Sequence, residues 1–147
     1  MSDRTLSSIL VDAPPGEVMA VIADFGAYPD WAGQVKEAEV LTEYEDDGRA
    51  EQVRFRLEAG PIKDDYTLSY DWDDDHEVRW TLVEARLLSA MDGSYTLEDQ
   101  GDGTTEVVYA LSVDIKLPLL GRMKRNAEKV IIDTALKGLK KRVEDGE

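Results

Sequence analysis

The chain contains 147 residues, of which 33% are charged and 42% hydrophobic, with no cysteine and a single histidine. These values predict one soluble globular domain over residues 1–147, and they exclude disulfides, thiolate metal clusters and sites built from several histidines. The net charge of −15 disfavours binding to nucleic acid or to anionic lipid.

The charge is unevenly distributed. Residues 1–118 carry 9 Lys and Arg against 27 Asp and Glu, a net of −18, whereas residues 119–147 carry 8 against 5, a net of +3. No stretch approaches the ~18 apolar residues of a membrane span, and no targeting segment is recognisable. We therefore expect a cytoplasmic protein without integral membrane association and without a nucleic-acid partner.

The beginning of the chain predicts a strand followed by two short helices. Residues 4–11 are short and β-branched at their end, and residues 12–15 stop them. Prolines suit the first turn of a helix. Apolar residues three or four apart then predict a helix over 15–24, which Gly26 ends. The aromatic-rich segment 25–31 predicts a short second helix.

From residue 34 to residue 116 apolar side chains recur at every second position, with turn residues between the runs. Val53, Phe55 and Leu57 alternate with Arg54 and Arg56, for example. This alternation predicts strands with one buried and one solvated face, and Asp-Gly pairs between runs predict hairpins. The six strands expected in this antiparallel meander cover residues 35–45, 49–59, 62–72, 77–83, 87–98 and 104–115.

Residues 119–144 predict one long helix after the last strand. At about 1.5 Å per residue, its length is roughly 39 Å. Its apolar residues form two stripes on different sides of the axis. The first stripe is Leu120, Met123, Ala127, Val130, Ile131 and Thr134, and the second is Ile132, Leu136, Leu139 and Val143.

The order of elements predicts an α+β architecture, in which a curved seven-stranded antiparallel sheet wraps around a long C-terminal helix. Two short helices connect the first two strands. The sheet has an apolar face to cover, and only the C-terminal helix is long enough to cover it. Because such a sheet does not close completely on one helix, we expect a cavity between them with room for an organic molecule.

Five motifs carry a resemblance to a known family: APPGEV at 13–18, DFGAYPDW at 24–31, GSYTL at 93–97, GTTEVVY at 103–109, and Arg125-Asn126 in the terminal helix. Together they resemble the START-like helix-grip superfamily (SRPBCC), in its polyketide cyclase/dehydrase and coenzyme Q-binding branch, over residues 4–144. The resemblance implies a helix-grip fold with a hydrophobic ligand cavity. Members bind lipids, quinones, plant hormones or polyketides, some cyclise polyketide chains, and one branch associates with ribosomes.

Aromatic, methionine and small helical side chains are the candidate ligand-binding residues. Tyr and Trp give a pocket apolar walls with a polar tip, and Met adapts to irregular ligands. The alternative is that the same side chains only form the core and pack the helix on the sheet. The candidates are Trp31, Phe55, Tyr66, Tyr70, Trp72, Trp80, Met91, Tyr95, Tyr109, Met123, Ala127, Val130 and Ile131.

No catalytic residue, metal site or cofactor is expected. Arg54, Arg56 and Arg79 alternate with apolar residues, so we expect their side chains to face solvent. His76 follows three aspartates without the glycine and distal glutamate of a calcium loop, which favours a solvated hairpin turn. The serines have no neighbouring base that would activate them.

The sequence therefore favours the binding or transport of a hydrophobic small molecule, lipid-like, quinone-like or polyketide-like, between the sheet and the C-terminal helix. The first alternative is a polyketide aromatase/cyclase, in which shaping a reactive chain is most of the catalysis and hydroxyl groups move protons. A charged group such as Arg79, Glu84 or Arg86 inside the cavity would favour it. The second is a ribosome-associated or other protein-interaction module, which the net charge of −15 disfavours as an rRNA-binding protein.

Overall fold

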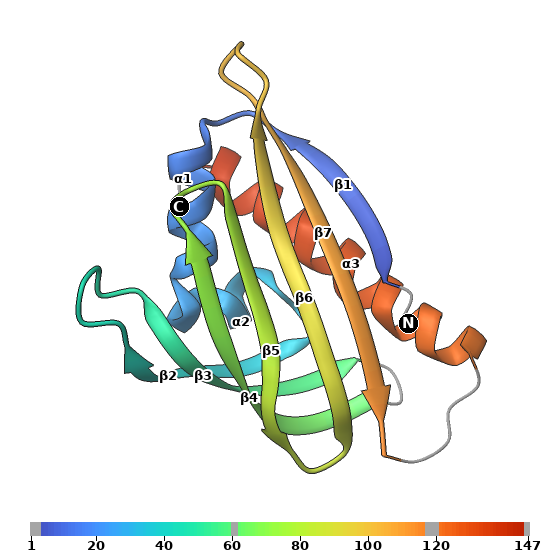
Figure 1. Ribbon diagram of the computed structural model, residues 1–147. Coiled ribbons are helices and arrows are strands. Elements are labelled where there is room, and N and C mark those ends of the chain that lie inside the picture. Colours follow the sequence, from blue (N-terminus) through green and yellow to red (C-terminus); the bar gives the residue numbers. More distant parts are fainter. Residues whose placement is uncertain (1–3, 60–61, 117–120, 146–147) are drawn as a thin grey trace.

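Strands and helices follow one another in the expected order in the computed structural model (Figure 1), which describes residues 4–59, 62–116 and 121–145. The elements are β1 (Thr5–Val11), α1 (Pro15–Ala23), the short 3₁₀ helix η1 (Phe25–Ala27), α2 (Tyr28–Trp31), β2 (Val35–Glu43), β3 (Ala50–Ala59), β4 (Ile62–Asp73), β5 (Glu77–Ala85), β6 (Leu88–Asp99), β7 (Thr105–Ile115) and α3 (Gly121–Glu144).

The seven strands form one antiparallel sheet in the order β1-β7-β6-β5-β4-β3-β2. Strands β2 to β7 form the meander that the alternation predicted, and β1 pairs with β7. The strand ends lie within two residues of the predicted ones. The predicted α+β fold is confirmed.

The sheet curves strongly around α3. In Figure 1, β5, β6 and β7 run steeply, whereas β2, β3 and β4 turn across the lower part of the molecule. Helix α3 passes diagonally across the face of the sheet near β1 and β7. Helices α1 and α2 lie at the left of this view, on the side of α3 away from β1. The concave face is therefore covered by α3 together with the segment that connects β1 to β2.

Alternation along the strands places the core. In β3, Val53, Phe55 and Leu57 are at most 3% exposed, while Arg54 and Arg56 are exposed. The same alternation continues in the neighbouring strands, because paired residues of a sheet share a face. The inner face is consequently apolar and aromatic, and the outer face is charged.

The turn between β6 and β7 depends on glycine. Gly101 has a φ of 81° and Gly103 a φ of 90°, values in the left-handed region that residues with a Cβ rarely adopt. The carboxylate of Asp99 accepts the N–H of Gly101, and that of Asp102 accepts the N–H of Thr104. The turn expected at residues 60–61 lies outside the described residues.

Helix α1 begins at Pro15, whose missing N–H costs nothing in the first turn of a helix. Val18, Met19 and Ile22 lie on one side of this helix and are fully buried. The helix ends at Ala23, one residue before the predicted end. Its apolar side thus helps α3 to close the concave face.

A buried glutamate fixes α3 to the sheet. Glu128 is 0% exposed, and its carboxylate accepts hydrogen bonds from the Thr5 hydroxyl at 2.6 Å and the Val113 N–H at 2.7 Å, and also from Lys124. Thr5 is the first residue of β1 and pairs with Leu111 of β7. Val113 lies two residues further along β7, so the Glu128 carboxylate joins α3 to both strands at the N-terminal end of β1.

The start of α3 predicted at residue 119, and Leu120 of the first stripe, lie outside the described residues. Residues of both predicted stripes are buried in the described part of the helix: Ala127, Ile131, Ile132, Leu136 and Leu139. Among the described residues, no helix combines the length and the apolar character needed to cross a membrane.

Candidate functional site

A cavity of about 50 Å³ lies between the inner face of the sheet and α3. Its wall includes Gln34 and Val35, which are half-buried, so the cavity reaches the surface where β2 begins. The lining residues are Tyr28, Ala32, Gln34, Val35, Phe55, Leu57, Tyr66, Leu68, Tyr70, Trp80, Met91, Tyr95, Tyr109, Ile131 and Ala135.

This cavity is small. A volume of about 50 Å³ compares with about 30 Å³ for one water in the liquid and about 150 Å³ for a cavity that binds benzene. The sequence predicted room for an organic molecule, whereas in this structure side chains fill most of that space. A ligand of even one aromatic ring therefore requires movement of the walls.

Aromatic rings from β4 to β7 form one side of the wall. The centroids of Tyr95 and Tyr109 are 4.5 Å apart, and Trp80 lies 5.5 Å from the first and 5.6 Å from the second. Tyr70 continues the group at 5.8 Å from Trp80. Tilted and edge-on contacts at these distances are the favourable arrangements of aromatic pairs, so this side of the cavity is well packed.

A second aromatic group joins the sheet to the helical connection. The ring centroid of Phe55 in β3 lies 5.5 Å from that of Tyr66 and 6.0 Å from that of Tyr28. The Tyr28 hydroxyl donates to the carbonyl of Ile22 in α1, which fixes α2 against α1 and turns the Tyr28 ring toward the sheet. The motif DFGAYPDW thus contributes a wall residue through Tyr28.

Gly93 sets the position of Trp80. These two residues are paired across β5 and β6, and a Cβ on Gly93 would lie only 2.4 Å from Cζ2 of the indole. Only glycine therefore allows the Trp80 ring to lie against β6 at this point. The GSYTL motif supplies this contact as well as Tyr95.

Burial keeps the phenols of the cavity protonated. Desolvation raises the pKa of Tyr66, Tyr70, Tyr95 and Tyr109, and for Tyr66, Tyr70 and Tyr95 the neighbouring phenols raise it further. The pKa of Tyr28 is raised well above its ordinary value for the same reasons. All five side chains are neutral hydroxyl groups near neutral pH.

Eight of the thirteen predicted ligand-binding residues line the cavity, and five do not. The eight are Phe55, Tyr66, Tyr70, Trp80, Met91, Tyr95, Tyr109 and Ile131. The five outside its wall are Trp31, Trp72, Met123, Ala127 and Val130. Whether the eight contact a ligand stays a prediction.

The placement of Met123 and Val130 toward the sheet was wrong. Met123 is 41% exposed and Val130 is 45% exposed. Ile131 and Ala135 face the cavity from α3 instead, because residues four apart lie above one another on a helix. Ala127 lies one turn earlier and is buried, but it packs outside the cavity wall.

Trp72 and Trp31 lie at the borders of the site. Trp72 is on the inner face at the far end of β4, where its indole N–H donates to the carbonyl of Ala50 and the guanidinium of Arg49 lies 5.0 Å from its ring. Trp31 is buried against Tyr28 at 4.7 Å, and the described residues offer its indole N–H no hydrogen-bond acceptor.

Sequence reasoning missed seven lining residues: Tyr28, Ala32, Gln34, Val35, Leu57, Leu68 and Ala135. Leu57 and Leu68 share the inward parity of Phe55 and Tyr66, so strand alternation contained that signal. Ala135 follows Ile131 by four residues and could have been found from helical spacing. No comparable signal identifies Gln34, because it lies in a connection without regular periodicity.

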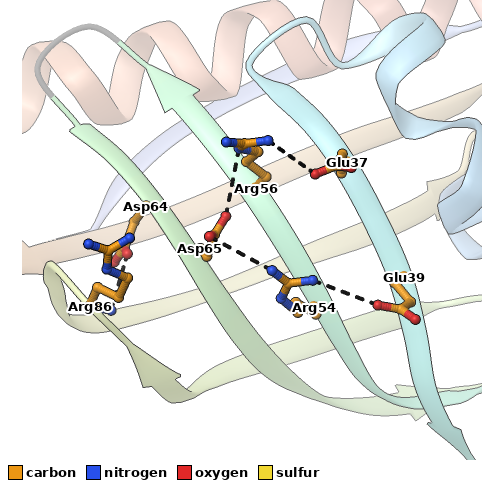
Figure 2. Close-up of polar contacts among 7 residues, drawn as sticks. All are labelled: Glu37, Glu39, Arg54, Arg56, Asp64, Asp65 and Arg86. Atoms are coloured by element: carbon orange, nitrogen blue, oxygen red, sulfur yellow. Dashed lines mark hydrogen bonds and ion pairs between the residues drawn. The ribbon is translucent and has the colours of Figure 1, made fainter.

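The arginines of β3 form an ion-pair network on the outer face (Figure 2). Arg54 lies 3.8 Å from both Glu39 and Asp65, and Arg56 lies 3.4 Å from Glu37 and 3.9 Å from Asp65. Exposed pairs of this kind contribute about 0–1 kcal/mol each. The expectation that these two arginines face solvent is confirmed.

The other charged candidates also lie outside the cavity. Arg79 pairs with Asp71 at 3.3 Å and with Glu77 at 3.5 Å on the outer face. Glu84 and Arg86 are exposed. Among the described residues, no charged side chain belongs to the cavity wall.

A larger hollow of about 500 Å³ lies beside the β3–β4 hairpin on the charged side. Charged residues such as Arg56, Asp65 and Arg86 line it. Near them, Asp64 accepts the backbone N–H groups of Arg86, Leu87 and Leu88, which holds the turn before β6. Figure 2 shows the contact with Arg86. Such an open, charged hollow does not suit a hydrophobic ligand.

His76 lies in the exposed turn between β4 and β5, with its Nδ1 3.1 Å from the carbonyl oxygen of Leu97. The hairpin turn that the sequence indicated is therefore present. Within the described ranges, no three His, Asp or Glu side chains are grouped as a metal site would require.

Comparisons with known proteins agree with this architecture. A START superfamily protein from Mycobacterium smegmatis superposes with a TM-score of 0.88 at 22% identity, covering 97% of each chain. The aromatase/cyclase Zhui from Streptomyces sp. R1128 gives a TM-score of 0.80 at 18% identity, over 98% of this chain and 94% of that one. A protein from Thermus thermophilus gives 0.80 at 21% identity, over 99% of each.

At these identities the structural likeness establishes the fold alone. In a search of curated protein sequences, no match is found. The sequence profile of the family described as polyketide cyclase / dehydrase and lipid transport, however, matches residues 4–144. The chain therefore belongs to the polyketide cyclase/dehydrase and lipid transport family, on a START-like fold.

Proposed function

We propose that this protein binds and carries a hydrophobic small molecule between the sheet and α3. The observation that supports this most directly is the uncharged, largely aromatic wall of the cavity, which reaches the surface at Gln34 and Val35. Apolar walls with a few polar groups are typical of small-molecule sites. Membership of a family that includes lipid transport supports the same function.

The position of the charges favours carriage over catalysis. A charged acid or base within reach of the substrate would favour an aromatase/cyclase. Arg79, Glu84 and Arg86 are exposed instead, and Arg79 is paired with acidic residues of the outer face. The described residues thus provide the cavity with hydroxyl groups but with no charged general acid or base.

Binding requires the cavity to widen. Met91 lines it with a flexible side chain, and Ile131 and Ala135 line it from α3. Methionine changes rotamer readily, and packed helices can shift by about 1–2 Å. We expect expansion on this side, while the aromatic rings of β5 to β7 keep their places.

Cyclase activity is a second candidate, because the cavity contains several tyrosine hydroxyls and the fold matches an aromatase/cyclase. Hydroxyl groups can move protons during aldol cyclisation if the substrate is held in a reactive shape. Incubation with a linear polyketide thioester would reveal a cyclised aromatic product. A bound but unchanged substrate would favour carriage.

The test of carriage is native mass spectrometry of the purified protein together with two matched variants. Ala135→Trp places an indole in the cavity wall, whereas Val130→Trp adds the same group at an exposed position of the same helix. We expect wild type and Val130→Trp to retain an organic ligand and Ala135→Trp to lose it. Equal retention by folded Ala135→Trp, or no ligand on any of the three, would contradict the proposal.

A further inference from the structure

Four buried tyrosines of the cavity wall present hydroxyl groups without a protein partner. Tyr66, Tyr70, Tyr95 and Tyr109, called here the phenol quartet, are 4–6% exposed. The Tyr28 hydroxyl, by contrast, donates to a carbonyl of α1. Among the described residues, no hydrogen bond satisfies the four hydroxyls of the quartet.

These hydroxyls face the cavity itself. Within the described part of the chain, the indole N–H of Trp31 is the one fully covered side-chain polar atom that lacks a partner. The hydroxyls of the quartet therefore retain accessible surface. Because their residues are almost completely buried and line the cavity, that surface lies inside it.

The quartet comes from three strands and converges on one space. Tyr66 and Tyr70 lie on β4, Tyr95 on β6 and Tyr109 on β7. All four side chains line the same cavity, and the ring centroids of Tyr95 and Tyr109 are 4.5 Å apart. Burial raises the pKa of each phenol. Each remains protonated and can donate a hydrogen bond.

Within residues 4–59, 62–116 and 121–145, no charged side chain in the cavity wall can neutralise a charged ligand. Apart from the tyrosines, the polar side chains of the wall are Gln34 and Trp80, both uncharged. An ionised carboxylate moved from water into such surroundings loses its hydration without gaining a counter-charge, which is strongly unfavourable. A pure hydrocarbon would also be a poor match, because it would leave four donors unpaired in an apolar site.

Resting on the carrier function proposed above, the geometry points to a definite ligand class. We infer that the phenol quartet selects uncharged, flat ring compounds that carry at least two hydrogen-bond-accepting oxygens, and rejects both carboxylates and hydrocarbons of the same size. The aromatic walls bind the ring faces, and the hydroxyls donate to the oxygens. Tyr66, Tyr70, Tyr95 and Tyr109 are thus specificity-determining residues.

Three probes of similar shape test this inference: chromone, which has two acceptor oxygens, naphthalene, which has none, and naphthoate, which is anionic. Equilibrium dialysis near neutral pH measures the affinity of each. Two hydrogen bonds at about 2- to 10-fold each predict that chromone binds about 4- to 100-fold more tightly than naphthalene. Naphthoate should bind more weakly than either.

Single Tyr→Phe variants at the four positions assign the effect to the hydroxyls. At least two of them should lower the affinity for chromone by about 2- to 10-fold. None should lower the affinity for naphthalene, because each removes a donor that naphthalene leaves unpaired. Tyr44→Phe is the matched control, because the Tyr44 hydroxyl donates to the backbone carbonyl of Tyr70 from outside the cavity. It should leave the affinity for both probes unchanged.

The outcomes separate this inference from the carrier function. If none of the probes binds, the inference about the ligand class fails, and the native mass spectrometry described above decides separately whether the carrier function fails with it. If naphthalene or naphthoate binds as tightly as chromone, or if the Tyr→Phe variants all keep wild-type affinity for chromone, the protein remains a carrier but the phenol quartet does not select its ligand. Circular dichroism confirms that each variant is folded, so a loss of binding cannot be attributed to unfolding.

Discussion

Replacing Glu128 by alanine removes a carboxylate that joins α3 to both β1 and β7. The substitution leaves the Val113 N–H buried without its acceptor, and it leaves the Lys124 ammonium, whose side chain is 21% exposed, without its counter-charge. Removing one partner of a buried ion pair costs about 3–5 kcal/mol. Because small domains have about 5–15 kcal/mol of stability, we expect Glu128→Ala to remove a large part of it.

Two further variants test the origin of that loss. Glu128→Gln keeps an acceptor for Val113 but loses the charge, so we expect a loss of about 1–3 kcal/mol. Asp133→Asn breaks the exposed pair with Lys129, 3.2 Å apart and with the same spacing on the same helix, and should cost at most about 0.5 kcal/mol. Urea denaturation followed by circular dichroism measures all three. Equal losses for Glu128→Ala and Asp133→Asn would refute the reasoning.

Three other expectations concern packing and protonation. Gly138→Ala would place a Cβ 1.8 Å from the carbonyl oxygen of Trp31. The resulting overpacking costs about 1–3 kcal/mol, which should exceed the gain in helix propensity of about 1 kcal/mol. A higher Tm of this variant in thermal unfolding would contradict the expectation. Gly93→Ala should displace Trp80, with a similar loss of stability and a change in tryptophan fluorescence; an unchanged emission spectrum would argue against the contact. Burial raises the pKa of the phenol quartet in the folded chain. Ionisation of the quartet should therefore leave the free energy of unfolding unchanged with pH below the ordinary tyrosine pKa of 10.0. Above that pH the free energy of unfolding should fall by up to about 1.4 kcal/mol per pH unit for each phenol, because the unfolded chain loses these protons first. Urea denaturation at a series of alkaline pH values should give a shallower slope for Tyr→Phe variants, and an unchanged slope would count against it.

The strands and their faces could be predicted because alternation in a sheet is rigid. Once a strand pairs, every second residue faces the same side, so Phe55, Tyr66 and Tyr109 were assigned correctly from their neighbours. Alternation does not say how far along the strand a cavity extends. Trp72 shares the parity of Tyr70 yet lies beyond the cavity, beside Arg49.

The rotation of α3 could not be predicted from its apolar residues. Two apolar stripes left the helix free to turn either side to the sheet, and Met123 and Val130 were placed on the wrong side. The side of α3 that faces the sheet is set by Glu128, because its hydrogen bonds to Thr5 of β1 and Val113 of β7 fix the rotation of the helix about its axis. Hydrophobic patterning treats a glutamate as a surface residue. The volume of the cavity also escaped prediction, because it depends on how all the rings pack together.

Three polar attachments of α3 lie along the edge of the sheet that β1 forms, in addition to its bonds to Val113 of β7 and Asp30 of α2. Besides the bond between Glu128 and Thr5, the Lys140 ammonium donates to the carbonyl of Leu10 at 2.8 Å, and Glu144 accepts the N–H of Asp12 at 2.9 Å. A rotation of the helix that preserves all three bonds has its axis parallel to β1. Such a rotation would leave these three bonds intact and would open the ion pair between Arg142 and Asp30 of α2, which are 3.9 Å apart, so the cavity would widen on the side of α3 that faces α2.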